Sequence, residues 1–138
     1  MSGRDVEDPA HGPAAAVIAA LPLDGRVLLV RRRRPPNADS WSFPGGKIAF
    51  GEGHVDAAVR ELREETGIAA DGAGVIGAVD VVTDSTHYVL VAVRMQYRSG
   101  VAAPDDDAAE VGWFALDELP APLLPDVRRI AAAALMDA

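Results

Sequence analysis

Residues 46–68 carry the pattern that most constrains how this chain can fold. The apolar residues of its second half recur at helical spacing, at Val55, Ala58, Val59 and Leu62. Gly67 follows them where the end of a helix often requires a left-handed residue, a conformation that glycine adopts without strain. The pattern therefore predicts an amphipathic helix over residues 54–66 that ends at this glycine.

The same helix carries three glutamates within about one turn. Because a helix turns by about 100° per residue, Glu61, Glu64 and Glu65 share one side, next to the apolar stripe. Like charges so close together repel each other, and a bound cation would relieve the repulsion. Clustered oxygen ligands without thiolates select Mg²⁺ or Mn²⁺, which bind few carboxylates and share phosphate oxygens. The alternative is a solvated acidic helix face.

Apolar runs separated by turn signals predict strands on both sides of this helix. Residues 14–21 and 26–30 flank Asp24-Gly25, a pair that favours a β-hairpin between the two runs. Further strands are expected over residues 41–43, 74–83, 87–97 and 110–114, a second helix over residues 123–136, and loops over residues 31–40 and 98–109.

The order of these elements predicts a fold class. Residues 87–97 are apolar on both sides, which is typical of a central strand. Pro44-Gly45-Gly46 predicts a turn in which glycine takes positive φ and lets the backbone approach a ligand. We expect a mixed β-sheet flanked by helices, an α/β or α+β fold, in a single domain over residues 13–138. Residues 1–12 are polar and rich in turn residues, which predicts a flexible tail.

Composition and charge argue against several classes of function. The 138 residues carry a net charge of −8 and no cysteine. General binding of a nucleic-acid polymer needs a basic surface, and disulfides and thiolate metal sites need cysteine. No apolar run reaches the roughly 20 residues that span a bilayer, and residues 1–10 lack the features of a signal peptide. We therefore expect a cytoplasmic protein that binds neither nucleic-acid polymer nor membrane.

The residues around the glutamates match one family motif at every specified position. The matching residues are Gly46, Glu52, Arg60, Glu61, Leu62, Glu64, Glu65, Gly67 and Ile68. With its spacing, this segment resembles the Nudix box, and Trp113 beyond the box is also similar to the family. The resemblance implies the Nudix fold, a mixed sheet between helices. It also implies an enzyme that hydrolyses a nucleoside diphosphate linked to another group, with water attacking phosphorus and divalent metals on the phosphates.

The resemblance further implies a set of metal ligands. These are the carbonyl of Gly46 and the carboxylates of Glu61, Glu64 and Glu65. Arg60 would pair with and orient a glutamate of the box, with Glu64 favoured. The implied cofactor is Mg²⁺, with Mn²⁺ as a substitute, the implied ligand is a small nucleotide, and a homodimer is compatible with the family.

Candidates for the general base and for substrate binding lie both inside and outside the box. Glu61 is the first candidate for the base, and Glu110 or one aspartate of residues 105–107 is the alternative. An anionic substrate in an acidic protein needs locally placed cations, for which Arg31 and Lys47 are candidates. Glu110 is a further candidate for substrate binding. For Arg31 the alternative is a solvated strand end, and residues 32–34 are expected at the surface.

The nature of the substrate depends on residues outside the box. Thr83 and Asp84 stand where many ADP-ribose pyrophosphatases have proline, so this marker is missing. Residues 27–34 and 110–119 nevertheless resemble proteins of that type, and an ADP-ribose-like substrate is therefore favoured. One alternative is a sanitising pyrophosphohydrolase for oxidised (deoxy)nucleoside triphosphates. Another is a non-catalytic domain that senses a nucleotide, against which the intact carboxylate set argues. An aromatic pair near the box, Trp41 and Phe43, is expected in the core rather than stacked on a base.

Overall fold

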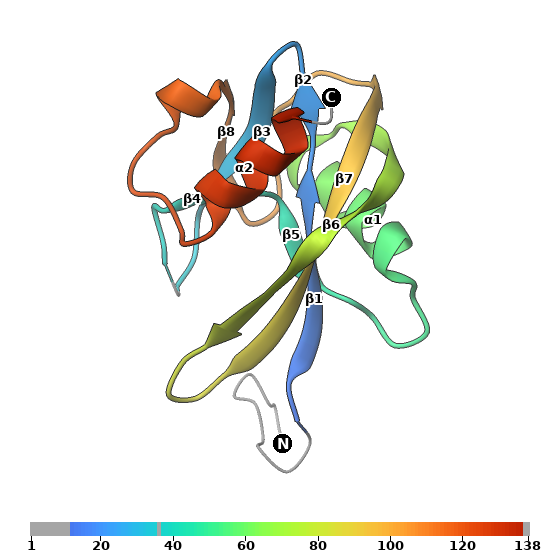
Figure 1. The fold of residues 1–138 in the computed structure, drawn as a ribbon, viewed down its shortest axis with the longest axis vertical. Coiled ribbons are helices and arrows are strands. Elements are labelled where there is room, and N and C mark those ends of the chain that lie inside the picture. The colour runs from blue at the N-terminus through green and yellow to red at the C-terminus, as the bar shows by residue number, and fades with distance from the viewer. Residues whose placement is uncertain (1–11, 36, 137–138) are drawn as a thin grey trace.

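Eight strands form two four-stranded sheets at the centre of the molecule (Figure 1). The computed structural model describes residues 12–35 and 37–136, so most of the predicted tail lies outside it. The strands are β1 (Ala14–Ala20), β2 (Pro22–Leu23), β3 (Arg26–Arg32), β4 (Trp41–Ser42), β5 (Gly45–Lys47), β6 (Ala69–Val82), β7 (His87–Ser99) and β8 (Ala108–Phe114). The helices are α1 (His54–Thr66), α2 (Val127–Met136) and the short 3₁₀ helix η2 (Leu116–Glu118).

The first sheet is mixed, as the sequence predicts. Its order is β5-β1-β7-β6, with β1 and β7 parallel and the other pairs antiparallel. The apolar strand β7 lies inside this sheet, which confirms its central position. In the second sheet, β3 pairs antiparallel with β2, β4 and β8. The predicted α/β class with helices around a mixed sheet is confirmed, with the strands divided between two sheets.

The predicted hairpin joins different strands from those expected. Residues 14–20 do not pair with residues 26–30, because β1 and β3 belong to different sheets, and the hairpin begins only at Leu21, whose carbonyl accepts the Leu28 N–H at 3.1 Å. The turn itself is correct: Asp24 and Gly25 have φ of 53° and 78° and connect β2 to β3. The chain thus leaves the first sheet after β1, and only the short β2 returns against β3. Turn residues define where a chain reverses, but not which strands pair.

Helix α1 has the predicted bounds and the predicted end. Gly67 takes the left-handed conformation with φ of 79°, and its N–H donates to the Arg63 carbonyl at 2.9 Å. Leu62 and Ala58, from the apolar stripe of the helix, are fully buried against Val17 of β1. The stripe therefore fixes which side of α1 faces the sheet.

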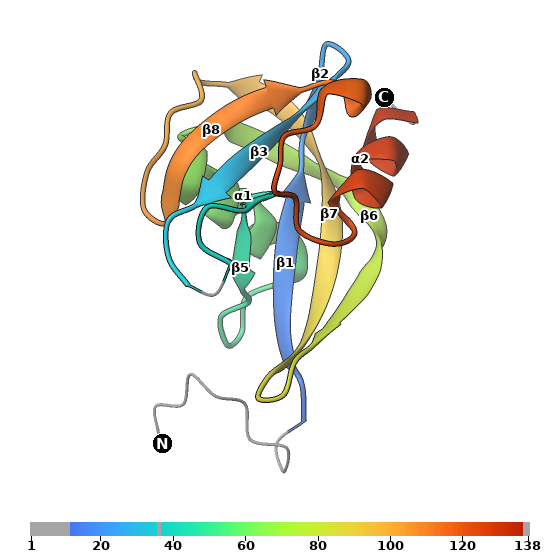
Figure 2. The same cartoon turned by 90° about the vertical axis from the view of Figure 1, so that its left-hand side faces the viewer.

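The two helices lie on opposite sides of the strands (Figure 2). Because strand side chains alternate, Leu28 joins the core that includes α1, whereas Leu29 joins the core that includes α2. Trp41 and Phe43 are buried in the second core, as predicted. Trp41 also contacts the Phe114 ring edge-on, with the ring centroids 5.1 Å apart. These aromatic rings are therefore structural.

Element boundaries differ from prediction where the local pattern is weak. Strand β6 begins at Ala69 rather than at residue 74, because its exposed, glycine-containing first half pairs with β7. Helix α2 begins at Val127 rather than at residue 123, because Leu123 forms a β-bridge with Trp41.

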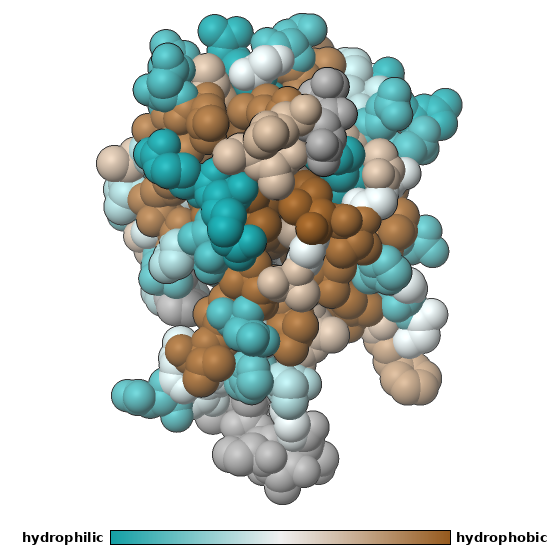
Figure 3. Space-filling view, in the orientation of Figure 1, coloured by the Kyte–Doolittle hydropathy of each residue, from teal (hydrophilic) through white to brown (hydrophobic). Residues whose placement is uncertain are grey.

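Figure 3 shows hydrophobic surface along β6 and β7, where Val75, Val81 and Val82 of β6 are exposed. Within the described residues, neither α-helix has the length and hydrophobicity to span a bilayer.

Arg94 of β7 anchors the end of α2. Its guanidinium donates to the Ala133 carbonyl at 2.9 Å and, over a shorter distance, to the Ala134 carbonyl. Helix ends leave such carbonyls without partners inside the helix, and a cation there also complements the helix dipole.

We expect Arg94→Met to lower the free energy of unfolding by about 1.5–3 kcal/mol, since it leaves part-buried carbonyls without a charged donor. Urea denaturation measures this change. Arg98→Met is the matched control, because Arg98 forms an exposed ion pair with Asp71, and such pairs contribute about 0–1 kcal/mol. Equal losses in the two variants would contradict the role of Arg94.

Candidate active site

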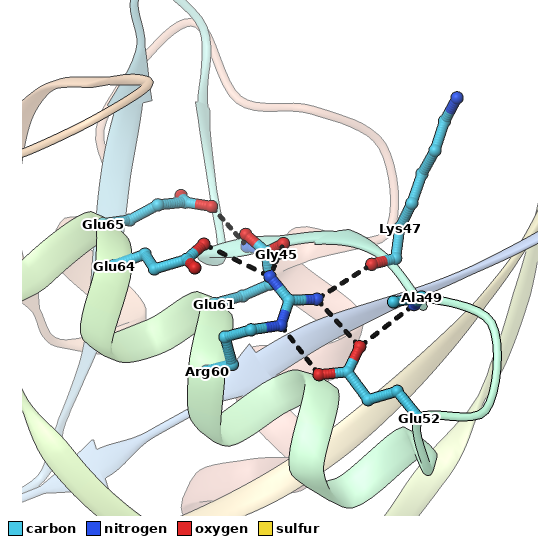
Figure 4. Close-up of polar contacts among 8 residues, drawn as sticks. All are labelled: Gly45, Lys47, Ala49, Glu52, Arg60, Glu61, Glu64 and Glu65. Atoms are coloured by element: carbon cyan, nitrogen blue, oxygen red, sulfur yellow. Dashed lines mark hydrogen bonds and ion pairs between the residues drawn. The ribbon is translucent and has the colours of Figure 1, made fainter.

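The guanidinium of Arg60 is the centre of a polar network between α1 and β5 (Figure 4). It donates to both carboxylate oxygens of Glu52, at 2.7 and 2.9 Å, and to the Lys47 carbonyl at 3.1 Å. It also contacts Glu61 at 2.9 Å and Glu64 at 3.2 Å. The predicted pairing of Arg60 with Glu64 is present, but Glu52 is the stronger partner.

Glu52 is absent from the site residues predicted from sequence, although it fixes the loop before α1. Its carboxylate accepts the Ala49 N–H at 3.0 Å as well as the two bonds from Arg60. The hydrogen bonds from Arg60, followed by that from Ala49, lower the pKa of Glu52 to about 2. The sequence feature that could have identified Glu52 as a site residue is its position in the family motif, eight residues before Arg60.

Gly45 and Gly46 allow β5 to lie unusually close to its neighbours. Both are extended residues of β5 without positive φ, so the predicted turn at Pro44-Gly45-Gly46 is wrong. Both glycines lie close to other parts of the protein: a Cβ on Gly46 would lie 2.5 Å from a carboxylate oxygen of Glu61, and one on Gly45 would overlap the Val17 carbonyl. The predicted approach to a ligand remains a prediction. Lack of space beside the β1 backbone therefore requires glycine at Gly45, whereas at Gly46 the nearest atoms are those of the Glu61 carboxylate.

Glu65 is a buried carboxylate at the last turn of α1. Its side chain accepts the Gly45 N–H at 3.3 Å, and only 6% of the residue is exposed. Burial, and then the adjacent Glu61 carboxylate, raise the pKa of Glu65 to about 9. The pair is thus electrostatically unfavourable when both carboxylates are ionised.

Of the three carboxylates predicted to bind metal, only two lie together in the structure. Glu61 and Glu65 face each other below β5, whereas the Glu64 side chain is 47% exposed and turns to Arg60. Among the described residues, no group of three or more acidic or histidine side chains is arranged to hold a metal ion as it stands. The donors still fit a hard cation, because they are oxygens and include the buried Glu65 carboxylate beside that of Glu61, whose repulsion a cation would relieve. The predicted ligand set remains a prediction.

The loop before β8 lies beside the end of α1. The Asp105 N–H donates to the Glu65 carbonyl at 3.0 Å, and the charge of Asp107 contributes to the raised pKa of Glu65. Asp107 also pairs with Arg34 at 3.1 Å. One of the aspartates proposed as an alternative base therefore lies near the carboxylate pair, and its role remains a prediction.

Among the described residues, none of the other predicted substrate-binding residues forms a hydrogen bond or ion pair with that pair. Arg31 contacts Glu110, directly opposite on β8, at 3.0 Å, and Asp39 at 2.7 Å. Figure 4 shows the Lys47 side chain extending away from the box glutamates, and its ammonium lies 5.7 Å from the centre of the Tyr88 ring. The structure thus joins Arg31 to Glu110 but separates Lys47 from both.

The raised pKa of Glu65 predicts how stability depends on pH without metal. The folded protein retains a proton that the unfolded chain loses above its ordinary pKa of 4.5, so this group lowers stability as pH rises from there towards about 9. Glu65→Gln should flatten that decline and leave the protein in EDTA equally or more stable at alkaline pH. Urea unfolding at about pH 5 and pH 9 measures it. The exposed Glu118→Gln is the control, and a steeper decline for Glu65→Gln would contradict the assignment.

Two known proteins are similar to this chain in sequence. The ADP-ribose pyrophosphatase of Methanocaldococcus jannaschii is 30% identical over 110 residues, 78% of this chain and 65% of that protein. The putative mutator protein MutT4 of Mycobacterium tuberculosis is 33% identical over 132 residues, 91% of this chain and 48% of that protein. The chain therefore spans less than two thirds of the length of either relative.

Solved structures and a family model define the family. The crystal structure of a MutT NUDIX hydrolase from Burkholderia pseudomallei superposes with a TM-score of 0.82 and 35% identity, covering 88% of this chain and 97% of that chain. The model of the NUDIX domain matches residues 10–134. Since this match covers nearly the whole chain and includes the glutamates around Arg60, the chain belongs to the Nudix family.

Proposed function

We propose that this protein hydrolyses the diphosphate linkage of a nucleoside diphosphate derivative with the help of Mg²⁺, and that an ADP-ribose-like substrate is preferred. The observation that carries the proposal is the pair formed by Glu61 and buried Glu65 beneath Gly45. A chain selected for stability alone has little reason to place a buried carboxylate directly beside a second carboxylate. Binding of a divalent cation between the two carboxylates would explain why they lie together.

Each residue of the site has its own proposed role. Glu61, Glu64, Glu65 and the Gly46 carbonyl would hold the cation. When bound, such a cation offsets the negative charge of the diphosphate and activates water. Arg60 keeps Glu61 and Glu64 in place through its two contacts and is itself held by Glu52. Binding of an ion by Glu64 requires its contact with Arg60 to weaken.

The general base is proposed among carboxylates close to the pair. Glu61 remains the first candidate, because it adjoins Glu65 directly. Both alternatives pair with an arginine, Asp107 with Arg34 and Glu110 with Arg31, but the charge of Asp107 also contributes to the raised pKa of Glu65. This supports the residue 105–107 loop over Glu110 as the second candidate.

Charge supports a diphosphate derivative over a triphosphate. The ion pairs of the arginines around the box are Arg31 with Asp39 and Glu110, Arg34 with Asp107, and Arg60 with Glu52, Glu61 and Glu64. Each of these cations is already opposed by carboxylate, in a chain of net charge −8. A triphosphate carries more charge to be offset than a diphosphate ester, and an ADP-ribose pyrophosphatase is among the similar proteins. The similarity to MutT proteins supports the second candidate, oxidised (deoxy)nucleoside triphosphates.

The deciding experiment is a panel of small nucleotides incubated with the protein and Mg²⁺, with the products separated by chromatography. The panel contains ADP-ribose, other nucleoside diphosphate derivatives, and ordinary and oxidised nucleoside triphosphates. We expect AMP and ribose 5-phosphate from ADP-ribose at the highest kcat/KM. Preferred release of pyrophosphate from an oxidised triphosphate would favour the second candidate. Tight nucleotide binding without any product would favour a sensing domain.

We expect activity to depend strictly on Mg²⁺ or Mn²⁺, because Arg31, Arg34 and Arg60 are already paired with carboxylates and cannot offset a diphosphate alone. Turnover in excess EDTA, followed by restoration with added Mg²⁺, measures this dependence. Full activity in EDTA would refute the metal requirement.

We expect Glu65→Gln to lower kcat by at least about a hundredfold and to raise the Mg²⁺ concentration needed for half-maximal activity, since it removes one charge from the proposed metal site. Steady-state kinetics over a Mg²⁺ titration measure both values. Arg63→Gln is the control, because Arg63 lies on the same helix and is exposed. Equal losses of turnover in the two variants would show that Glu65 is not a ligand.

We expect Arg31→Ala to raise KM by roughly tenfold while changing the melting temperature little, because its ion pairs are largely exposed. Kinetics and thermal unfolding of the same preparation separate the two effects. An unchanged KM with a clearly lower melting temperature would make Arg31 a structural residue.

A further inference from the structure

Arg31 is held from two directions by carboxylates of different origin. Its Nε donates to Glu110 at 3.0 Å, and its NH1 donates to Asp39 at 2.7 Å. Glu110 lies opposite Arg31 in the β3–β8 ladder, so strand pairing places it. Asp39 belongs to the loop between β3 and β4 and has no such ladder partner. Its placement therefore needs a separate explanation.

The loop places Asp39 through a constrained backbone. Asp39 has φ of 70°, a left-handed conformation that is costly for any residue with a Cβ. Its N–H donates to the Arg32 carbonyl at 2.8 Å, and the Arg32 N–H donates to the Ser40 carbonyl at 2.8 Å. These bonds fix Asp39 next to the end of β3. Aspartate tolerates this conformation better than most residues, but glycine would do so at lower cost.

Stability does not account for an aspartate at this position. The Asp39 side chain is 76% exposed, and an exposed ion pair contributes little to folding because water and salt screen it. What the contact does change is the freedom of the guanidinium. With Nε and NH1 held, the NH2 group keeps a defined direction, and no described residue accepts a hydrogen bond from it.

We propose that Asp39 is a positioning residue, which holds the Arg31 guanidinium so that its NH2 group can donate to a phosphate oxygen of the substrate. The inference rests on the proposed function, in which Arg31 binds substrate. Fixing a guanidinium before binding lowers the entropy lost when the substrate binds. Loss of Asp39 should therefore weaken binding without altering the chemistry at the box glutamates.

The kinetic test uses Asp39→Asn, Arg31→Ala and the double variant, with Mg²⁺ and whichever of ADP-ribose and dGTP is hydrolysed. Asp39→Asn should raise KM about fivefold and leave kcat within about twofold, and the double variant should have the KM of Arg31→Ala. The control is Asp71→Asn, which breaks an exposed pair of similar geometry with Arg98 on β6 and β7 and should leave both constants unchanged. Additive effects of the two substitutions would overturn the proposal.

A second measurement does not depend on turnover. Relaxation of the Arg31 Nε–H resonance by NMR, without metal or substrate, should show greater motion in Asp39→Asn than in the wild type, and no change in Asp71→Asn. An unchanged Arg31 signal would overturn the holding role of Asp39. If Arg31→Ala raises KM but Asp39→Asn does not, the positioning role fails while the proposed function stands. If the wild type hydrolyses neither these compounds nor any other member of the nucleotide panel, the proposed function and the substrate role of Asp39 fail together.

Discussion

The close approach of β5 to helix α1 is the constraint on which the site depends. At Gly46 there is no room for a side chain between the strand and the Glu61 carboxylate, and at Gly45 none beside β1. This proximity lets the Gly45 N–H reach Glu65 and lets Arg60 reach the Lys47 carbonyl. A side chain on Gly45 would push β5 away from β1, and one on Gly46 would displace the Glu61 carboxylate.

Charge is distributed unevenly around this contact. Arg60 compensates Glu52, Glu61 and Glu64, so the outer part of the site is balanced. Glu65 is buried, and among the described residues it has no arginine or lysine partner. A buried carboxylate beside another carboxylate is unfavourable unless it is protonated or bound to a cation. The edge of the site is therefore compensated by Arg60, whereas Glu65 at its centre has no cationic side chain beside it among the described residues.

Local sequence patterns predicted the elements whose cause is local. Helix α1 follows from its apolar spacing, and its end follows from Gly67, because both depend on residues within a few positions. The predicted β1–β3 hairpin was wrong, because the choice between β3 and β7 as partner depends on the packing of the whole chain. The turn predicted at Gly45-Gly46 was wrong for a similar reason. Glycine is compatible with both a turn and a crowded strand, and only the neighbouring chain distinguishes them.

The sequence by itself determined the helix, the apolar strands and three glutamates on one helical side, because these follow from residue spacing along a single element. Only the tertiary structure decided that Glu61 pairs with the buried Glu65 while Glu64 turns outwards, since β5 covers one part of that side and leaves the other open. Likewise, Arg31, Asp39 and Glu110 are unremarkable in sequence. They meet only because β3 pairs with β8 and the loop after β3 folds back, and such contacts between distant segments have no signature along the chain.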